Sequence, residues 1–262
     1  MKHVVITGST RGVGLFMAKE FLAAGCSVTL SGRGKELPEA ARNELKPYEQ
    51  NYIYIPCDVQ QKASLQNLWD TSCKRWGSVD VWINNAGQNV PHENVWETGE
   101  AYTENVIHTN LTGMIFGSQI AAEGMLKQGS GAIYSMEGLG SDGMIQRKTI
   151  LYGTTKRALR YFMQALAKEL EGTCVIAGRL SPGMMLTDFI TKTPDGERSE
   201  VIADAKFVKL FNALADRPET VARFLVPRML SNTKNNVLIA WLTNRKAAWR
   251  FATAGMRKEK LI

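Results

Sequence analysis

Cysteine, histidine and long apolar runs are scarce in this sequence, and each shortage excludes a class of protein. The four cysteines, Cys26, Cys57, Cys73 and Cys174, show no CxxC spacing, so we expect neither a disulfide framework nor a zinc site. The three histidines have no partner at metal-ligand spacing, so we predict no metal site. No apolar run approaches the roughly 20 residues that a membrane-spanning helix needs.

The N-terminus and the distribution of charge also narrow the possibilities. A strand pattern begins at His3, which leaves no room for a signal or transit peptide, so we expect a cytoplasmic protein. The formal net charge is +7. Basic residues concentrate only in the last twenty positions, which favours a solvated terminal helix over a nucleic-acid-binding surface.

Short apolar strands alternate with helical patterns along most of the chain. The expected strands are His3–Thr7, Ser27–Leu30, Tyr52–Ile55, Val79–Ile83, Ala132–Met136, Cys174–Arg179 and Val237–Ala240. The expected helices are Gly12–Ala24, Leu37–Leu45, Ala63–Trp76, Tyr102–Lys127, Ile150–Glu171, Pro218–Leu230 and Thr243–Arg257. This order predicts an α/β fold with one Rossmann-type, doubly wound parallel sheet of about seven strands. No linker-like composition or repeat interrupts the chain, so residues 1–262 are expected to form one domain.

Two segments near the C-terminus depart from the alternation. Residues 184–215 are mixed in pattern and predict a mobile substrate lid. The lid carries apolar side chains, which suit a wide apolar cleft or simply pack the lid against the body: Met184, Met185, Leu186, Phe189, Ile190, Phe207 and Phe211. The amphipathic helix expected at about 243–258 bears Trp249 and Phe251 among basic residues. It could make peripheral contact with a membrane, cover a neighbouring subunit or remain solvated.

A glycine-rich loop joins the first strand to the first helix. It reads Thr7-Gly8-Ser9-Thr10-Arg11-Gly12-Val13-Gly14. Glycines let the backbone turn tightly and approach a pyrophosphate, while the helix N-terminus presents free N–H groups. Between a strand and a helix of an alternating chain, this loop predicts a dinucleotide site formed by residues 8–14.

The end of the second strand predicts which dinucleotide is bound. NAD sites of this kind place a carboxylate there for the ribose 2′-hydroxyl, whereas NADP sites need a cation for the 2′-phosphate. This strand ends Leu30-Ser31-Gly32-Arg33, without an acid. Arg33 can pair with a phosphate through two hydrogen bonds, and Arg11 is close enough in the glycine loop to assist. We therefore predict NADPH/NADP as the cofactor.

A tyrosine and a lysine four residues apart open a long predicted helix. Tyr152 and Lys156 share one helix face, so the ammonium group should lie beside the phenol. A neighbouring cation favours phenolate, and we expect it to lower the pKa of Tyr152 from its ordinary value of about 10. Such a tyrosine can give a proton to a carbonyl oxygen.

Further motifs appear in a characteristic order along the chain. They are Asp58-Val59 after the third strand, Asn84-Asn85-Ala86-Gly87 after the fourth, Asn110-Leu-Thr-Gly113 in the next helix and Ser181-Pro182-Gly183 after the sixth. With the glycine loop and the Tyr152–Lys156 pair, residues 3 to about 190 resemble the short-chain dehydrogenase/reductase family. The resemblance implies an oxidoreductase that uses Asn110, Tyr152 and Lys156 as a proton relay. It also implies homo-oligomers, as dimers or tetramers, and cofactor contacts from Asp58, Val59, Asn85, Ala86, Gly87, Tyr152, Lys156, Pro182, Gly183 and Thr187.

One residue of the family pattern is displaced. The family carries a serine just after the fifth strand that holds the substrate carbonyl, but here Glu137 and Gly138 occupy the usual serine positions. Ser141 is the best replacement by type and place, and we predict it as the carbonyl donor. The alternative reading, that Ser141 only caps a loop, stays open. Ser135 lies too early, inside the predicted strand.

The departure is shared with one branch of the family. The segments Ser135–Ser141, Tyr152–Arg160, Ser181–Asp188 and Pro218–Arg228 resemble chlorophyll(ide) b reductases, which reduce the 7-formyl group of chlorophyll b to hydroxymethyl with NADPH. Three functions remain open at this stage. They are a reductase of a chlorophyll-type pigment, an NADPH-dependent reductase of another hydrophobic aldehyde or ketone, and a non-catalytic NADPH-binding sensor or scaffold.

Overall fold

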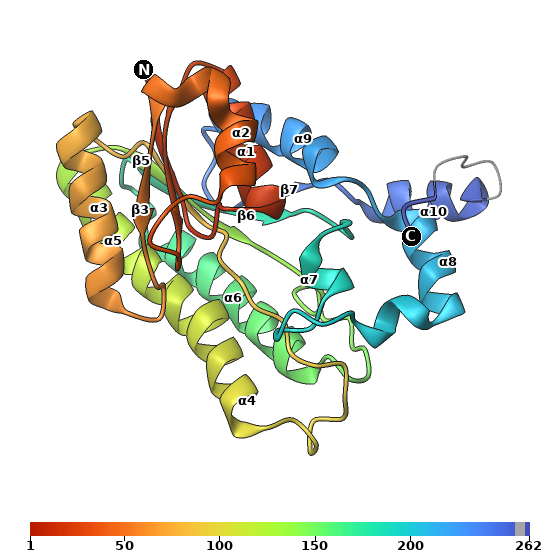
Figure 1. The fold of residues 1–262 in the computed structure, drawn as a ribbon. Helices are drawn as coiled ribbons and strands as arrows, with labels where there is room; N and C mark the ends of the chain where they lie inside the picture. The colour runs from red at the N-terminus through yellow and green to blue at the C-terminus, as the bar shows by residue number, and fades with distance from the viewer. Residues whose placement is uncertain (255–259) are drawn as a thin grey trace.

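The computed structural model describes residues 1–254 and 260–262 and contains one seven-stranded sheet (Figure 1). Its strands are β1 (His3–Ile6), β2 (Ser27–Gly32), β3 (Tyr52–Pro56), β4 (Val81–Asn84), β5 (Gly131–Met136), β6 (Val175–Ser181) and β7 (Val237–Ala240). All pairings are parallel, in the order β3-β2-β1-β4-β5-β6-β7. The predicted doubly wound, Rossmann-type sheet is confirmed.

Helices connect the strands and cover both faces of the sheet. They are α1 (Gly12–Ala23), α2 (Glu39–Leu45), α3 (Lys62–Trp76), α4 (Glu100–Ile107), α5 (Gly113–Gln128), α6 (Ile150–Glu169), α7 (Asp188–Thr191), α8 (Ala205–Leu214), α9 (Pro218–Ser231) and α10 (Asn244–Ala252). The C-terminal helix expected at 243–258 ends at Ala252 in the structure, and residues 255–258 of that prediction lie outside the described residues.

The two faces of the sheet bury separate apolar clusters because successive strand residues point in opposite directions. In β1, Val4 and Ile6 belong to the cluster that contains residues of α1 and α9. Val5, between them, belongs to the cluster formed with α3, α5 and α6. These residues of β1 are fully buried, so the central strand is fixed on both faces.

The long helix predicted at Tyr102–Lys127 is interrupted in the structure. The residues that link α4 to α5, His108–Thr112, form a π-helical segment. Asn110 lies in this segment and is 1% exposed. A π-helical segment accommodates an extra residue per turn and is common at functional sites. The sequence pattern does not reveal it, since the apolar spacing on either side continues.

The lid predicted at 184–215 contains two helices, α7 and α8, with a 3-10 segment at Glu200–Ala203. Its base is tied to the C-terminal region, since Arg250 of α10 pairs with Asp216 through both oxygens, at 2.6 and 2.9 Å. Within the described residues, no helix has both the length and the apolar character that crossing a bilayer requires.

Candidate active site

The residues predicted for function gather where the carboxyl ends of the central strands meet. The glycine loop follows β1, Asn85 follows β4, Gly138 follows β5 and Pro182 follows β6. Ligands of open parallel sheets bind at this edge, beside the point where the strand order reverses. That point lies between β1 and β4, which are direct neighbours in the sheet.

The glycine loop is folded so closely on its neighbours that side chains are excluded. Gly8 has φ +61°, and a Cβ there would lie 2.8 Å from the Cα of Ala86. A Cβ on Gly14 would lie 2.5 Å from the amide nitrogen of Asn85 and 2.7 Å from the carbonyl oxygen of Gly8. The loop therefore presents bare backbone at the start of α1, as a pyrophosphate site requires.

Polar contacts tie the loop to the neighbouring strands. The amide of Asn85 donates to the carbonyl oxygens of Thr7 and Gly8, both at 2.9 Å. Ser9 is fully buried; its hydroxyl donates to the Ile6 carbonyl and accepts from the Ser31 N–H. The side chain of Ser9 thus holds the loop to β2, and Asn85 holds it to β4.

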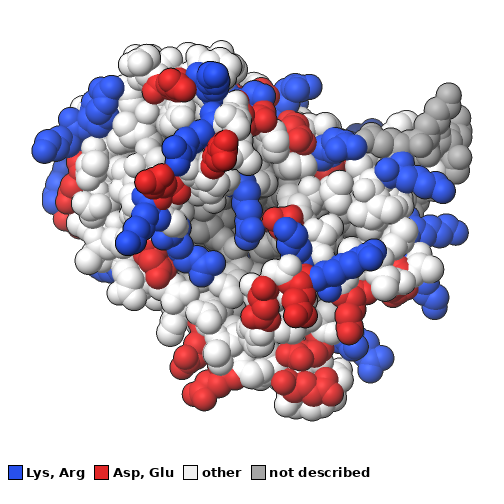
Figure 2. All heavy atoms as spheres, viewed as in Figure 1, with Lys and Arg blue, Asp and Glu red and all other residues white. Residues whose placement is uncertain are grey.

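Exposed arginines flank the loop. Arg33 directly follows β2 and is exposed. Arg11 contacts Asp188 of the lid at 3.3 Å, and both side chains are largely solvent-accessible. Figure 2 shows Lys and Arg side chains around the hollow at the centre of this face. Since the contact between Arg11 and Asp188 is exposed, it contributes little stability by itself.

Tyr152 and Lys156 lie side by side at the start of α6, as predicted. The ammonium nitrogen of Lys156 is 5.6 Å from the centroid of the Tyr152 ring and donates to the Met136 carbonyl at 3.0 Å. Both side chains are buried. The carbonyl of the last β5 residue therefore holds the ammonium group next to the phenol.

Asn110 reaches the same place from the π-helical segment. Its amide nitrogen donates to the Gln88 carbonyl at 2.9 Å and to the Thr155 hydroxyl at 3.2 Å, while its oxygen accepts from the Gln88 N–H at 2.7 Å. A Cβ on Gly87 would lie 3.6 Å from the Asn110 amide oxygen and 3.9 Å from the Lys156 ammonium nitrogen. Asn110, Tyr152 and Lys156 thus converge.

The expected lowering of the Tyr152 pKa is wrong. Burial raises the pKa of this phenol well above its ordinary value, because the low-dielectric interior disfavours phenolate. Burial also lowers the pKa of Lys156 to about 8, against the charge of Glu137, which acts to raise it. The sequence-based prediction is wrong because it leaves out the desolvation of the buried phenol.

Comparison with known proteins now identifies the family. A model of the family described as short chain dehydrogenase matches residues 2–198. The chain belongs to the short chain dehydrogenase family. The extent of the match agrees with the resemblance seen from residue 3 to about 190, and the family is one of oxidoreductases.

Curated relatives in this family carry pigment-related names. "Probable chlorophyll(ide) b reductase NYC1, chloroplastic" of Arabidopsis thaliana is 33% identical, over 98% of this chain and 54% of the relative. "Chlorophyll(ide) b reductase NOL, chloroplastic" of Oryza sativa subsp. japonica is 34% identical, over 99% of this chain and 78% of the relative. The chain thus spans about half the length of the first relative and about three quarters of the second.

Solved structures agree with the family fold. A 3-ketoacyl-(acyl-carrier-protein) reductase from Brucella melitensis, complexed with NADH, has a TM-score of 0.80 at 19% identity and covers 94% of this chain and 98% of its own. A closed form of serine dehydrogenase complexed with NADP+ has a TM-score of 0.77 at 26% identity, covering 90% and 93%.

The displaced serine of the family pattern is fully engaged within the fold. The Ser141 hydroxyl is buried, donates to the Lys156 carbonyl at 3.2 Å and accepts from the Gly138 N–H at 3.1 Å. In this arrangement its proton points toward α6 and is not presented to a substrate. Gly138 instead faces Tyr152, since a Cβ there would collide with the Tyr152 hydroxyl.

The lid covers the tyrosine from the other side. The ring of Phe189, in α7, packs edge-on against the Tyr152 ring, with centroids 5.4 Å apart. Thr187 lies near the glycine loop, because a Cβ on Gly12 would be 3.6 Å from its methyl group. The lid therefore contacts both the predicted cofactor loop and the predicted acid.

The remaining predicted residues surround this centre. Asp58 caps the turn after β3 by accepting from the Gln60 N–H at 3.0 Å. Val59 is buried against Gly113, since a Cβ added to Gly113 would lie 2.9 Å from the Val59 side chain. Pro182 and Gly183 follow β6, and Gly183 has φ +72° with no room for a side chain beside Leu242.

Two further residues are not indicated by the sequence pattern. Thr155 accepts from Asn110 and donates to the Tyr152 carbonyl at 2.7 Å, which links two of the residues predicted to form a relay. The sequence feature that could have indicated Thr155 is its position between Tyr152 and Lys156. Glu137 is 5% exposed beneath the turn that ends at Ser141, and its type alone is the signal, since a glutamate at the end of a buried strand is unusual.

Proposed function

We propose that this chain is an NADPH-dependent carbonyl reductase that reduces the 7-formyl group of a chlorophyll b-type pigment to hydroxymethyl. The observation that carries the proposal is the convergence of Tyr152, Lys156 and Asn110 at the carboxyl edge of the sheet. The relatives named for chlorophyll(ide) b reduction, which align with nearly the whole chain, support the substrate class.

The cofactor site is assigned from the fit of the backbone to a dinucleotide. Gly8 and Gly14 let the loop pack closely on Ala86 and Asn85, where any Cβ would collide, and such a tight glycine turn at a helix N-terminus fits a pyrophosphate. Arg33 provides the cation for a 2′-phosphate at the end of β2, where no carboxylate follows the strand. We assign to cofactor binding Gly8, Ser9, Thr10, Arg11, Gly12, Val13, Gly14, Arg33, Asp58, Val59, Asn85, Ala86, Gly87, Tyr152, Lys156, Pro182, Gly183 and Thr187.

The chemistry follows from the protonation states that burial favours. NADPH, when bound, supplies a hydride to the carbonyl carbon. Burial keeps Tyr152 protonated, so its hydroxyl can donate a hydrogen bond to the carbonyl oxygen and then transfer the proton to it. The adjacent Lys156 ammonium group stabilises the phenolate that this transfer leaves. Asn110, which lies in the π-helical segment and donates a hydrogen bond to Thr155, is the third member of the proposed relay.

Ser141 requires a change of role within this proposal. Its hydroxyl bonds to the Lys156 carbonyl, so Ser141 contributes by holding the turn rather than by donating to the substrate. The phenol of Tyr152 then remains the donor to the carbonyl oxygen. The glycine at 138 fits this role of Tyr152, because any side chain there would collide with the phenol hydroxyl.

The test measures NADPH oxidation by the purified full chain. Chlorophyllide b is compared with a panel of simple aromatic and aliphatic aldehydes, and the pigment product is identified by chromatography. We expect NADPH-dependent formation of the 7-hydroxymethyl product. Turnover of simple aldehydes without turnover of the pigment overturns the substrate and leaves a reductase of another hydrophobic carbonyl. NADPH binding without turnover of any carbonyl leaves the sensor or scaffold.

Assembly and location belong to the same proposal. In α10, Arg250 faces inward to Asp216 and the Leu214 carbonyl, whereas Trp249 and Phe251 are 65% and 53% exposed. We propose that these two aromatic residues make the contact expected of the terminal helix, with a second subunit or at a membrane surface. Two measurements compare wild type with a Trp249→Ser, Phe251→Ser variant. A loss of oligomer in light scattering indicates a subunit contact, whereas a loss of sedimentation with anionic vesicles indicates a membrane contact.

A further inference from the structure

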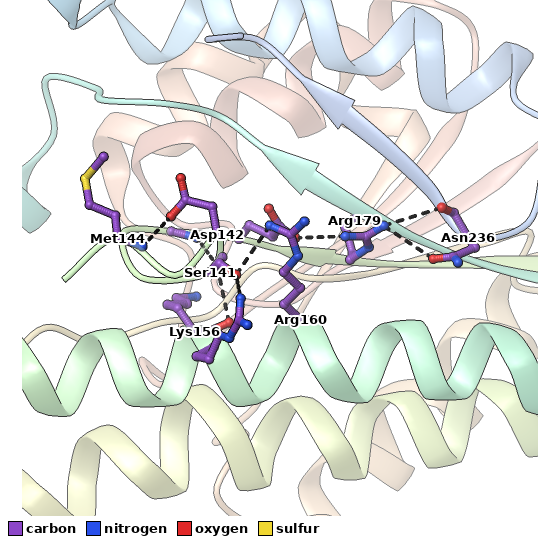
Figure 3. Close-up of polar contacts among 10 residues, drawn as sticks. Ser141, Asp142, Met144, Lys156, Arg160, Arg179 and Asn236 are labelled. Atoms are coloured by element: carbon purple, nitrogen blue, oxygen red, sulfur yellow. Dashed lines mark hydrogen bonds and ion pairs between the residues drawn. The ribbon is translucent and has the colours of Figure 1, made fainter. Parts of the chain in front are cut away.

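A cluster of buried charges lies directly behind the reacting residues. The Glu137 carboxylate and Arg179 of β6 are each 5% exposed, and the two side chains approach to 3.4 Å. Arg160 of α6 approaches the same carboxylate oxygen at 4.0 Å. Arg179 also donates to the side-chain oxygen of Asn236, at 3.3 Å (Figure 3).

This cluster is poorly arranged for stability. The distances around Glu137 are long for charge-assisted hydrogen bonds, which are usually shorter than 3 Å. Among the described residues, the Nε of Arg179 is buried without a hydrogen-bond partner. A buried ion pair of this kind often stabilises a fold less than apolar side chains of the same size. Its position next to the relay therefore needs a different explanation.

The cluster continues into the turn that replaces the family's serine segment. Arg160 and Arg157 both donate to the Ser141 carbonyl, at 3.4 and 3.2 Å. Ser141 in turn closes the turn on Gly138 and bonds to the Lys156 carbonyl. Figure 3 shows Arg160 between Arg179 and Ser141, above the helix that carries Lys156. One chain of contacts thus joins Glu137 to the helix turn of Lys156.

The placement of this turn determines the space around the tyrosine. Gly138 lies so close to the Tyr152 hydroxyl that a side chain there would collide with it. On the other side of Glu137, the Met136 carbonyl accepts from the Lys156 ammonium group. The residues on both sides of Glu137 therefore contact the two reacting groups.

We propose that Glu137 is a positioning residue of the relay, a role that rests on the proposed reductase function. Its buried carboxylate holds residues 138–141 against Tyr152 through Arg160. The same negative charge opposes the desolvation of the Lys156 ammonium group and keeps it charged beside the phenol.

The charges that face these groups agree with this role. Arg160 from α6, Arg179 from β6 and Asp142 from the turn all act on Glu137; burial raises the pKa of its carboxyl, and the two arginines oppose that rise. Glu137 acts to raise the pKa of Lys156, which burial has lowered to about 8. Removal of the anion must therefore lower the pKa of Lys156 further.

The experiment titrates Lys156 directly. Protein labelled with carbon-13 at the lysine Cε positions is followed by NMR as the pH is raised, with the Lys156 signal assigned from Lys156→Met. We expect Glu137→Gln to move the Lys156 midpoint to lower pH by about one unit, the shift expected for a nearby charge. Glu137→Asp, which keeps the charge, should leave the midpoint near the wild-type value. This measurement needs no substrate, so it does not depend on the choice of pigment.

Activity provides the second readout. If the pigment or any aldehyde is reduced, the high-pH limb of kcat/KM should move to lower pH in Glu137→Gln by the same amount. Asp142→Asn is the matched control, because it removes an exposed negative charge from the same turn, and it should move neither measurement to lower pH. A purely structural Glu137 would lower activity or Tm in Glu137→Gln without moving either midpoint, and that result would overturn the proposal.

A double variant tests the proposal if Glu137→Gln alone does not fold. Glu137→Gln with Arg179→Gln removes both buried charges, so no unpaired guanidinium group is left in the interior. Because Glu137 is the charge that acts on Lys156, this double variant should also lower the Lys156 midpoint. An unchanged midpoint in the folded double variant contradicts the proposed role.

Discussion

The two sides of the site are built in different ways. On the cofactor side, the backbone itself forms the surface, at glycines such as Gly8 and Gly14 that leave no room for a side chain. On the side proposed for the reaction, buried side chains form the surface, and Tyr152 and Lys156 of α6 are held by contacts from β5 and the lid. The first side depends on local backbone geometry, and the second on groups that are far apart in the sequence.

The largest expected effect tests the reacting side alone. Tyr152→Phe removes the donated proton and should reduce kcat by about 10²–10⁴-fold, the usual contribution of a general acid. NADPH affinity, measured by fluorescence titration, should fall far less than kcat, since the glycine loop is untouched and Tyr152 is one of many assigned cofactor contacts that loses only its hydroxyl. Undiminished turnover would refute the assignment of Tyr152. Loss of NADPH binding would show that the two sides are not separable.

The next effect tests the cofactor side alone. Gly8→Ala places a Cβ 2.8 Å from the Cα of Ala86 at a positive φ, so NADPH should bind roughly 100-fold more weakly. Gly25→Ala is the matched control, because Gly25 has φ +81° but no atom within 4 Å of the added Cβ. The control should lower Tm slightly and leave NADPH affinity unchanged. If NADPH affinity falls equally in both variants, the effect at Gly8 is due to backbone strain and not to the collision with Ala86.

Cofactor choice distinguishes Arg33 from general positive charge. Arg33→Ala should weaken NADPH binding by about ten- to a hundredfold and leave NADH binding nearly unchanged, because only the 2′-phosphate is lost as a partner. Arg75→Ala, an exposed arginine in α3, serves as the control and should alter neither affinity. Parallel loss of both cofactors in Arg33→Ala would contradict the assignment to NADPH.

The smallest effect concerns the lid. Phe189→Ala removes the edge-on contact with Tyr152, and since such pairs contribute about 0.5–1.5 kcal/mol, KM should rise by no more than about tenfold. Phe207→Ala removes a lid aromatic residue that packs on Phe211 instead, and it should change KM less. If KM rises equally in the two variants, the contact between Phe189 and Tyr152 has no specific effect on KM.

Much of the site could be read from local patterns. The spacing of Tyr152 and Lys156 places both on one face of α6, and the glycines of residues 8–14 mark a loop that only bare backbone can form. The sign of the Tyr152 pKa shift could not be read, since it depends on burial under Phe189 and the lid. The bond from Ser141 to the Lys156 carbonyl was equally hidden, because these residues are 15 positions apart.

The sequence by itself determined the alternating strands and helices, the glycine-rich loop and the family, because each depends on residue types at short, regular spacing. Only the tertiary structure decided the π-helical segment at Asn110 and the inward turn of the Ser141 hydroxyl. It also decided that Glu137 lies between Arg160 and Arg179. These features follow from packing between distant segments, where desolvation and hydrogen bonds compete, and no local pattern records which of the two prevails.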